Sequence, residues 1–151
     1  MGDNNNARAG QLPPEPYPEL RKLDRLVGRW KVSGPDVNGE VEYEWMEGGF
    51  FLIQHVELEA FGREIKGAEY IGFDEDTGTL RSHFVDNQGS NFTYTWDLDG
   101  DDLWIWFGEK GSDNFFHGTF EESGDRYSGR WQWPEPGGVT GGYEAILTRE
   151  G

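Results

Sequence analysis

The stretch Leu23-Asp24-Arg25-Leu26-Val27-Gly28-Arg29-Trp30 joins a short helical turn to the first of many β-strands. Leucines at helical spacing follow Pro18, which suits the first position of a helix, and Gly28 ends that pattern. Gly28 allows the backbone to turn sharply beneath the Trp30 indole, and a large indole at this position can close one end of a barrel. The stretch therefore predicts a short N-terminal helix that plugs a β-barrel.

From Arg29 onward, apolar and polar residues alternate and turn signals recur about every ten residues. This pattern predicts about ten strands, near residues 29–33, 39–46, 50–60, 64–73, 79–86, 91–98, 102–107, 114–121, 126–133 and 143–149. Short connections make consecutive strands pair as hairpins, and closure of such a meander removes its exposed edges. We therefore expect an all-β fold, a closed antiparallel meander barrel.

The chain has room for one domain, because 151 residues are too few for two cores of ordinary size. Residues 1–17 are polar and rich in proline, which predicts a disordered arm. Residues 18–151 are expected to form the single barrel domain. The glycine pairs within residues 134–142 predict a mobile connection before the last strand.

Side-chain alternation predicts an aromatic interior. In the second strand Glu40, Glu42 and Glu44 share one face, so Tyr43 and Trp45 face inward. Several Tyr and Trp side chains in one interior favour a cavity, since each carries a polar group that needs a partner. Simple filling of the core is the alternative. The residues predicted to contact a ligand are Tyr43, Trp45, His55, His83, Tyr94, Trp96 and Trp131.

Charge limits the classes of partner. The formal net charge is −16 and no segment gathers basic residues, so neither nucleic acid nor an anionic membrane is an expected partner. Neutral, aromatic or cationic small molecules fit better. The absence of cysteine excludes thiolate chemistry. Because no signal-peptide or membrane-spanning pattern occurs, a cytoplasmic location is expected.

The candidate catalytic residues are His55, Glu69 and His83, although alternation does not decide which way they or His117 face. A carboxyl group desolvated in an aromatic cup would have a raised pKa that suits proton transfer. The histidine spacing matches no metal-binding motif, so no metal is expected. A cyclase, isomerase or dehydratase with a His or Glu base and a Tyr donor is therefore the alternative to simple binding.

The opening Leu26-Val27-Gly28-Arg29-Trp30 and the closing Leu147-Thr148-Arg149 resemble the calycin superfamily of lipocalins and fatty-acid-binding proteins. In those barrels a Gly-x-Trp opens the first strand and a basic residue of the last strand packs over the Trp. The resemblance implies a cup-shaped barrel in which Arg149 covers Trp30 by a cation–π contact worth about 1 kcal/mol.

More narrowly, this opening, Glu42-Tyr43-Glu44-Trp45 and Tyr70-Ile71-Gly72-Phe73-Asp74 resemble a family of bacterial calycin-like domains of unknown function. The heme-binding nitrobindins share the Gly-x-Trp, and they would imply a heme held by a His near the C-terminus. Here Lys31-Val32-Ser33 lacks their alternating glycines and no His follows His117, so no cofactor is expected.

Binding of a small apolar or aromatic molecule in the barrel is thus the leading expectation. A third interpretation concerns the outer face, where Trp104 and Trp106 alternate with inward-facing apolar residues. An apolar outer face of this kind predicts a homodimer in which a second subunit covers the two indoles.

Overall fold

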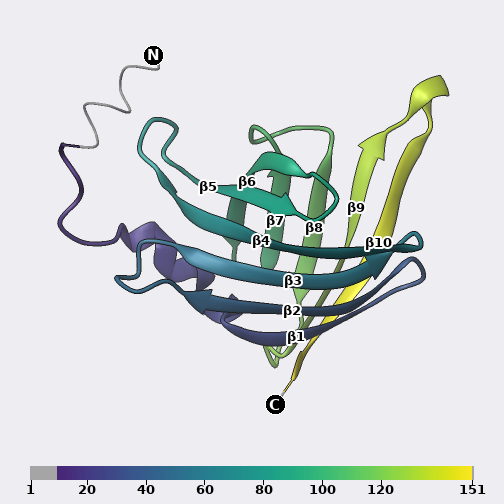
Figure 1. Cartoon of the computed structure of the whole chain (residues 1–151), viewed down its shortest axis with the longest axis horizontal. Helices are drawn as coiled ribbons and strands as arrows, with labels where there is room; N and C mark the ends of the chain where they lie inside the picture. The colour runs from purple at the N-terminus through teal and green to yellow at the C-terminus, as the bar shows by residue number, and fades with distance from the viewer. Residues whose placement is uncertain (1–9, 151) are drawn as a thin grey trace.

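A computed structural model describes residues 10–150 and shows a closed barrel of ten antiparallel strands. Each strand pairs with its sequence neighbours, and β1 closes the barrel against β10 (Figure 1). The elements are η1 (Pro18–Leu26), β1 (Gly28–Ser33), β2 (Val37–Trp45), β3 (Leu52–Ala60), β4 (Arg63–Asp74), β5 (Thr79–Asp86), β6 (Asn91–Asp99), β7 (Asp102–Phe107), β8 (Phe115–Phe120), β9 (Arg126–Pro134), η2 (Pro136–Gly138) and β10 (Thr140–Glu150). The predicted all-β meander barrel is confirmed.

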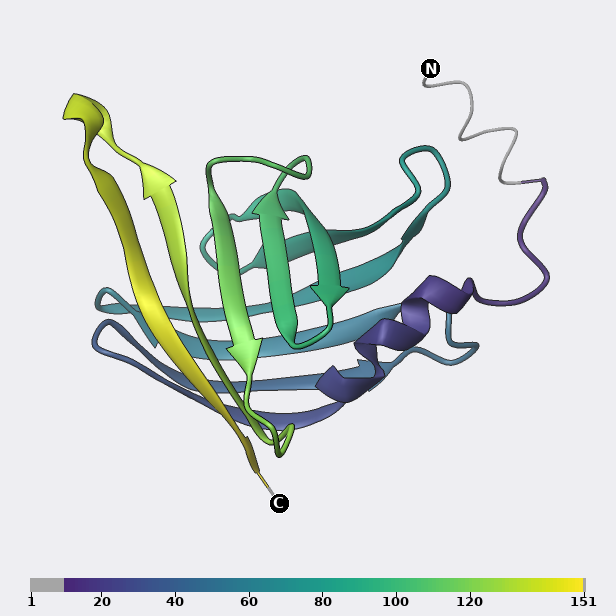
Figure 2. The ribbon, with the colours of Figure 1, turned by 180° about the vertical axis from the view of Figure 1, so that it is seen from behind.

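The N-terminal helix η1 lies at one end of the barrel (Figure 2). Its apolar side chains Leu20, Leu23 and Leu26 are fully buried, as is Trp30 at the start of β1. The Trp30 indole Nε1 donates a hydrogen bond of 2.8 Å to the carbonyl oxygen of Leu26, so the helix end satisfies the polar group of the buried ring. The helix and the indole together close this end of the barrel.

Arg149 completes this closed end. Its guanidinium lies 4.3 Å from the centre of the Trp30 ring, which confirms the cation–π contact. Its Nη1 donates to the carbonyl oxygen of Val27 at 2.6 Å and its Nη2 to that of Arg25 at 2.8 Å. Gly28 has a φ of 126°, and a Cβ there would lie 2.7 Å from Nη1. The sequence needs glycine at this position for both reasons.

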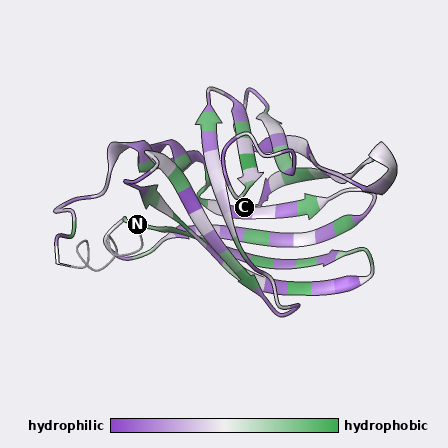
Figure 3. Ribbon diagram, turned by 90° about the horizontal axis from the view of Figure 1, so that it is seen from above, coloured by the Kyte–Doolittle hydropathy of each residue, from purple (hydrophilic) through white to green (hydrophobic). Residues whose placement is uncertain are grey.

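The alternation of faces also agrees with prediction. Along β2 the glutamates point outward while Val41 and Tyr43 are buried, and the same order holds along β9 and β10. The alternation is visible as changes between hydrophobic and hydrophilic residues along the strands (Figure 3). The barrel therefore has an apolar interior and a charged exterior.

Three local features differ from the sequence-based prediction or extend it. Helix η1 is a 3₁₀ helix that ends at Leu26, before Gly28. The predicted mobile connection at residues 134–142 is wrong in part, because Gly141 and Gly142 belong to β10 and pair with β9. Within the predicted disordered arm, Tyr17 packs against Phe73 with ring centres 4.5 Å apart, whereas residues 1–9 lie outside the described residues. No helix within residues 10–150 is long and apolar enough to cross a membrane.

Candidate functional site

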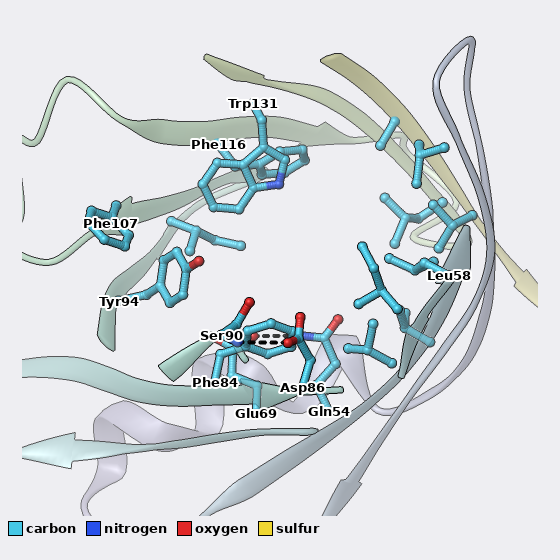
Figure 4. Close-up of a pocket in the computed structure, with 18 of the residues that line it drawn as sticks. Gln54, Leu58, Glu69, Phe84, Asp86, Ser90, Tyr94, Phe107, Phe116 and Trp131 are labelled. Carbon is cyan, nitrogen blue, oxygen red and sulfur yellow. Dashed lines mark hydrogen bonds between the residues drawn. The ribbon is translucent and has the colours of Figure 1, made fainter. Parts of the chain in front are cut away.

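A cavity of about 490 Å³ occupies the barrel interior away from the closed end. Its walls are mainly aliphatic and aromatic, and they include Tyr43, Phe84, Tyr94, Phe116, Tyr127 and Trp131. The volume falls in the range of small-molecule pockets, which are typically concave and mostly apolar with a few polar groups. Gln54, Glu69, Asp86 and Ser90 lie together on one wall, which we call the polar wall, whereas Trp131 and Phe116 lie on the opposite wall (Figure 4). The cavity thus combines a large apolar surface with one polar wall.

Glu69 of β4 is the central group of the polar wall. Its side chain is buried, and it accepts hydrogen bonds from residues of β3, β5 and β6. Gln54 Nε2 donates to Oε1 at 2.9 Å, while Ser82 Oγ and Trp96 Nε1 donate to Oε2 at 2.5 and 3.2 Å. The Ser82 hydroxyl in turn accepts a bond of 2.9 Å from Trp96 Nε1. This network fixes the carboxyl group at the cavity wall.

Burial raises the pKa of Glu69 to about 7, and the hydrogen bonds from Ser82, Trp96 and Gln54 offset only part of that rise. All three donors are neutral, so they stabilise the carboxylate without cancelling its charge. Near neutral pH the side chain is therefore present both as a carboxylate and as a carboxylic acid. It can accept or donate a proton, or bind a cation.

Tyrosine hydroxyl groups supply further polar atoms to the cavity. Burial raises the pKa of Tyr43, of Tyr94 and of Tyr127, and it raises the pKa of Tyr143 to about 12. Tyr43 and Tyr127 are hydrogen-bonded to each other. All four side chains remain neutral at physiological pH. One hydroxyl proton of the Tyr43–Tyr127 pair is used within the pair, whereas Tyr94 and Tyr143 can donate to a bound molecule.

Asp86, at the end of β5, is the second carboxylate of the lining. Its Oδ1 accepts backbone hydrogen bonds of 2.9 Å from both Gln88 and Ser90, which hold the turn before β6. Among residues 10–150, the charged side chains that line the cavity are Glu69 and Asp86, and both are acidic. No Lys, Arg or His among the described residues lines the cavity.

The three histidines lie on the outer face, which corrects the prediction that His55 and His83 contact a ligand. His55 bonds Glu44 at 2.6 Å, and His83 is exposed. His117 stacks on Trp104 with ring centres 4.0 Å apart and bonds Asp102 at 3.0 Å. The cavity therefore offers no imidazole to a heme iron, and the described residues contain no cluster of His, Asp and Glu that could hold a metal ion.

Trp45 and Trp96 have the predicted inward orientation but do not line the cavity. Trp45 donates to Asp24 Oδ1 at 2.9 Å and lies beneath the guanidinium of Arg21, so helix η1 covers it. Trp96 is buried behind Glu69. Alternation predicts the face to which a side chain belongs, but not whether it lies in the filled or the hollow part of the barrel. Of the predicted contact residues, Tyr43, Tyr94 and Trp131 do line the cavity.

Sequence reasoning missed Gln54 and Asp86 on the polar wall, and it missed Ser82, which donates to Glu69. Alternation along β5 could have predicted that Ser82 and Asp86 face inward, because they share a face with Leu80 and Phe84. The inward orientation of Glu69 was also accessible, because it shares a face with Ile65 and Ile71. Glu69 and Ser82 form one network with Trp96 because of the register between β4, β5 and β6. The alternation along a single strand does not predict that register.

Trp104 and Trp106 point outward, as predicted, and stack on each other with ring centres 5.7 Å apart. Trp106 is nevertheless only 8% exposed. The Lys110 ammonium lies 5.9 Å from the centre of its ring. The homodimer expected through these two residues stays a prediction.

Comparison with solved structures supports the fold. The chain matches the crystal structure of Rv2717c from M. tuberculosis with a TM-score of 0.56 and 17% sequence identity, over 91% of this chain and 100% of that one. At this identity the likeness concerns the fold, which is consistent with a calycin-like barrel. A search of curated protein sequences found no significant match. The model of one family matches residues 15–103, more than half of the chain. The chain therefore belongs to the family described as "Protein of unknown function (DUF1579)".

Proposed function

We propose that this protein binds a small apolar or aromatic molecule inside the barrel. The observation that carries the proposal is the cavity of about 490 Å³ with aromatic and aliphatic walls. Protein interiors are normally packed to a density that leaves few voids larger than a water molecule. A hollow of this size in a barrel whose other end is tightly packed is therefore best explained by a bound ligand.

The test is binding of N-phenyl-1-naphthylamine, an aromatic dye that is uncharged at neutral pH and whose fluorescence increases in apolar surroundings. Ala145 lines the cavity from β10, so Ala145→Phe places a ring in the space that the dye needs. We expect wild-type protein to bind the dye, and we expect the variant to bind it about tenfold more weakly or worse.

Thr148→Phe is the matched control, because Thr148 lies on the outer face of the same strand and is exposed. This variant adds the same ring outside the barrel and should retain wild-type dye affinity. The proposal is rejected if wild-type protein does not bind the dye at micromolar concentrations, or if the two variants lose affinity equally.

Glu69 supports a second candidate function, acid–base catalysis on the bound molecule. Its pKa of about 7 suits proton transfer at neutral pH. Tyr94 lines the same cavity and can donate a hydrogen bond to an oxygen of the substrate. His55 and His83 are not candidates, because both lie outside the barrel.

Catalysis can be tested on any molecule that native mass spectrometry finds bound to the purified protein. That molecule is incubated in D₂O with wild-type protein or with Glu69→Gln, and its mass is then measured. Proton abstraction from carbon by Glu69 predicts deuterium incorporation with wild type alone. Equal incorporation, or none with either protein, assigns the cavity to binding without this chemistry.

A further inference from the structure

We propose that the ligand carries a protonated amine, that Glu69 binds this ammonium group on the polar wall, and that the apolar part of the ligand fills the rest of the cavity. This inference rests on the proposed function, because it adds the charge of a ligand whose binding in the barrel is itself proposed.

The charges that line the barrel interior are of one sign. The charged residues of the lining are Glu69 and Asp86, and within residues 10–150 no basic side chain lines the cavity. A buried carboxylate is costly, and the hydrogen bonds to Glu69 offset only part of that cost. An ammonium group in the cavity would be the counter-ion that the side chains of residues 10–150 do not supply.

The two carboxyl oxygens of Glu69 accept different numbers of hydrogen bonds. Its Oε2 accepts two hydrogen bonds, from Ser82 and Trp96, whereas Oε1 accepts one, from Gln54. A carboxylate oxygen can accept two hydrogen bonds in its plane, so Oε1 retains capacity for another donor. Because the side chain lines the cavity, that donor can come from a ligand.

Aromatic rings form a large part of the cavity wall. Tyr94 and Trp131 contact each other with ring centres 5.9 Å apart, and both line the cavity, Trp131 on the wall opposite Glu69 (Figure 4). Aromatic faces attract cations, and this attraction strengthens when water is excluded. The walls therefore suit both an ammonium group and the apolar body attached to it.

The net charge of the protein also favours a cationic ligand. The formal net charge is −16, and Asp86 adds a carboxylate to the cavity lining at the end of β5. Such a field attracts cations and repels anions, which affects association rates and local concentration. An anionic ligand of equal size would meet two carboxylates and, among the residues that the structure describes, no basic side chain in the lining.

The experiment uses three probes of matched shape: 4-phenylbutylamine, 4-phenylbutan-1-ol and 4-phenylbutyrate. Their affinities are measured by calorimetry and by displacement of N-phenyl-1-naphthylamine. At pH 7.5 we expect the amine to bind about tenfold more tightly than the alcohol, because a charge-assisted hydrogen bond replaces a neutral one. The carboxylate should bind most weakly.

Glu69→Gln removes the charge and keeps nearly the same shape. It should weaken amine binding about tenfold and leave alcohol binding nearly unchanged, which also shows that the cavity remains intact. Glu57→Gln is the control, since Glu57 lies on the outer face of β3 and its change alters the net charge equally. It should leave the amine affinity at the wild-type value.

The pH dependence gives a readout that a purely structural role would not produce. Since the pKa of Glu69 is about 7, amine binding must displace a proton at lower pH. Amine affinity should fall about tenfold from pH 8 to pH 6 in wild type and stay nearly constant in Glu69→Gln. A primary alkylamine keeps its charge throughout this range, as lysine does.

Glu69 is hydrogen-bonded to Gln54 of β3, Ser82 of β5 and Trp96 of β6. The other titratable groups near it are the hydroxyls of Tyr43 and Tyr94, and Asp86 is the other carboxylate of the lining. The two tyrosines do not titrate between pH 6 and 8, because their pKa values are raised. The control Glu57→Gln, on the outer face of β3, should retain the pH slope of amine binding.

Equal or weaker binding of the amine relative to the alcohol would overturn the inference, as would an amine affinity unaffected by Glu69→Gln. In both cases dye or alcohol binding would show that the proposed function stands. Failure of the dye and of all three probes to bind would reject the proposed function as well.

Discussion

The two halves of the barrel use large aromatic side chains in opposite ways. At the closed end Trp30 is fully buried, and its ring contacts those of Tyr127 and Phe120 at centre distances of 5.0 and 6.3 Å. In the hollow half Trp131 contacts Tyr94 and Phe116 on its flanks and borders the cavity. The same residue type therefore completes a core in one half and forms a wall in the other.

The two halves differ because helix η1 packs into one of them. Helix η1 supplies three buried leucines to the closed end, so the space between the strands is filled there. No comparable segment within residues 10–150 fills the other half, where the cavity lies. Tyr127 separates the two, because it packs on Trp30 and also lines the cavity. An aromatic-rich barrel thus becomes a cup when one end is plugged.

The largest expected effect tests the filled half. Trp30→Ala should reduce the free energy of unfolding by about 4 kcal/mol, since it removes a fully buried indole and leaves a cavity. Trp131→Ala should cost about 1–2 kcal/mol, because that ring already borders empty space. Urea denaturation of both variants measures the difference. Similar losses would contradict the distinction between core and wall.

Glu69→Gln tests the polar wall of the hollow half. The folded-state pKa of about 7 lies above the ordinary glutamate value of 4.5, so the folded protein binds more protons between these two pH values. The stability that Glu69 contributes is fully present below pH 4.5 and is lost as the pH rises through 7. From pH 5 to 8 the loss is on the order of 2–3 kcal/mol.

The variant lacks this loss, so its free energy of unfolding relative to wild type should increase between pH 5 and pH 8. Chemical denaturation at several pH values measures the change. Glu57→Gln, on the outer face, should run parallel to wild type. A Glu69→Gln curve that is also parallel to wild type would mean that the buried carboxyl group is not destabilised by its surroundings.

A smaller effect is expected from Arg149→Lys at the closed end. Lysine keeps the charge but cannot reproduce the donation to Val27, Arg25 and Asp125 or the stacking on Trp30. We expect a loss of about 1–2 kcal/mol in unfolding free energy, with dye affinity unchanged. A loss of dye affinity without a loss of stability would contradict the separation of the two halves.

The fold could be predicted from sequence because it depends on local patterns. Each strand has a period-two alternation, the turns carry their own signals, and the Gly28–Trp30 opening with Arg149 indicates a plugged barrel. Even the outward position of His55 was accessible, because it shares a face of β3 with Glu57 and Glu59. The two apolar faces at the start of that strand hid the pattern.

The site could be predicted only in part, because it depends on depth and register. Tyr43, Tyr94 and Trp131 were found from alternation, yet Trp45 and Trp96 follow the same rule and lie elsewhere. Their positions depend on how far helix η1 and the Glu69 network extend into the barrel. These are contacts between elements far apart in sequence, and no single strand contains them.

The most direct test of the account is an NMR titration that observes the indole N–H signals of the tryptophans. Addition of N-phenyl-1-naphthylamine should shift the signal of Trp131, which lines the cavity, and leave that of Trp30 unchanged, because it is buried behind Tyr127 and bonded to Leu26. Assignment by Trp→Phe variants identifies each signal. Shifts confined to Trp104 and Trp106 on the outer face, or no shift at all, would contradict the claim that the hollow half of the barrel is a ligand site.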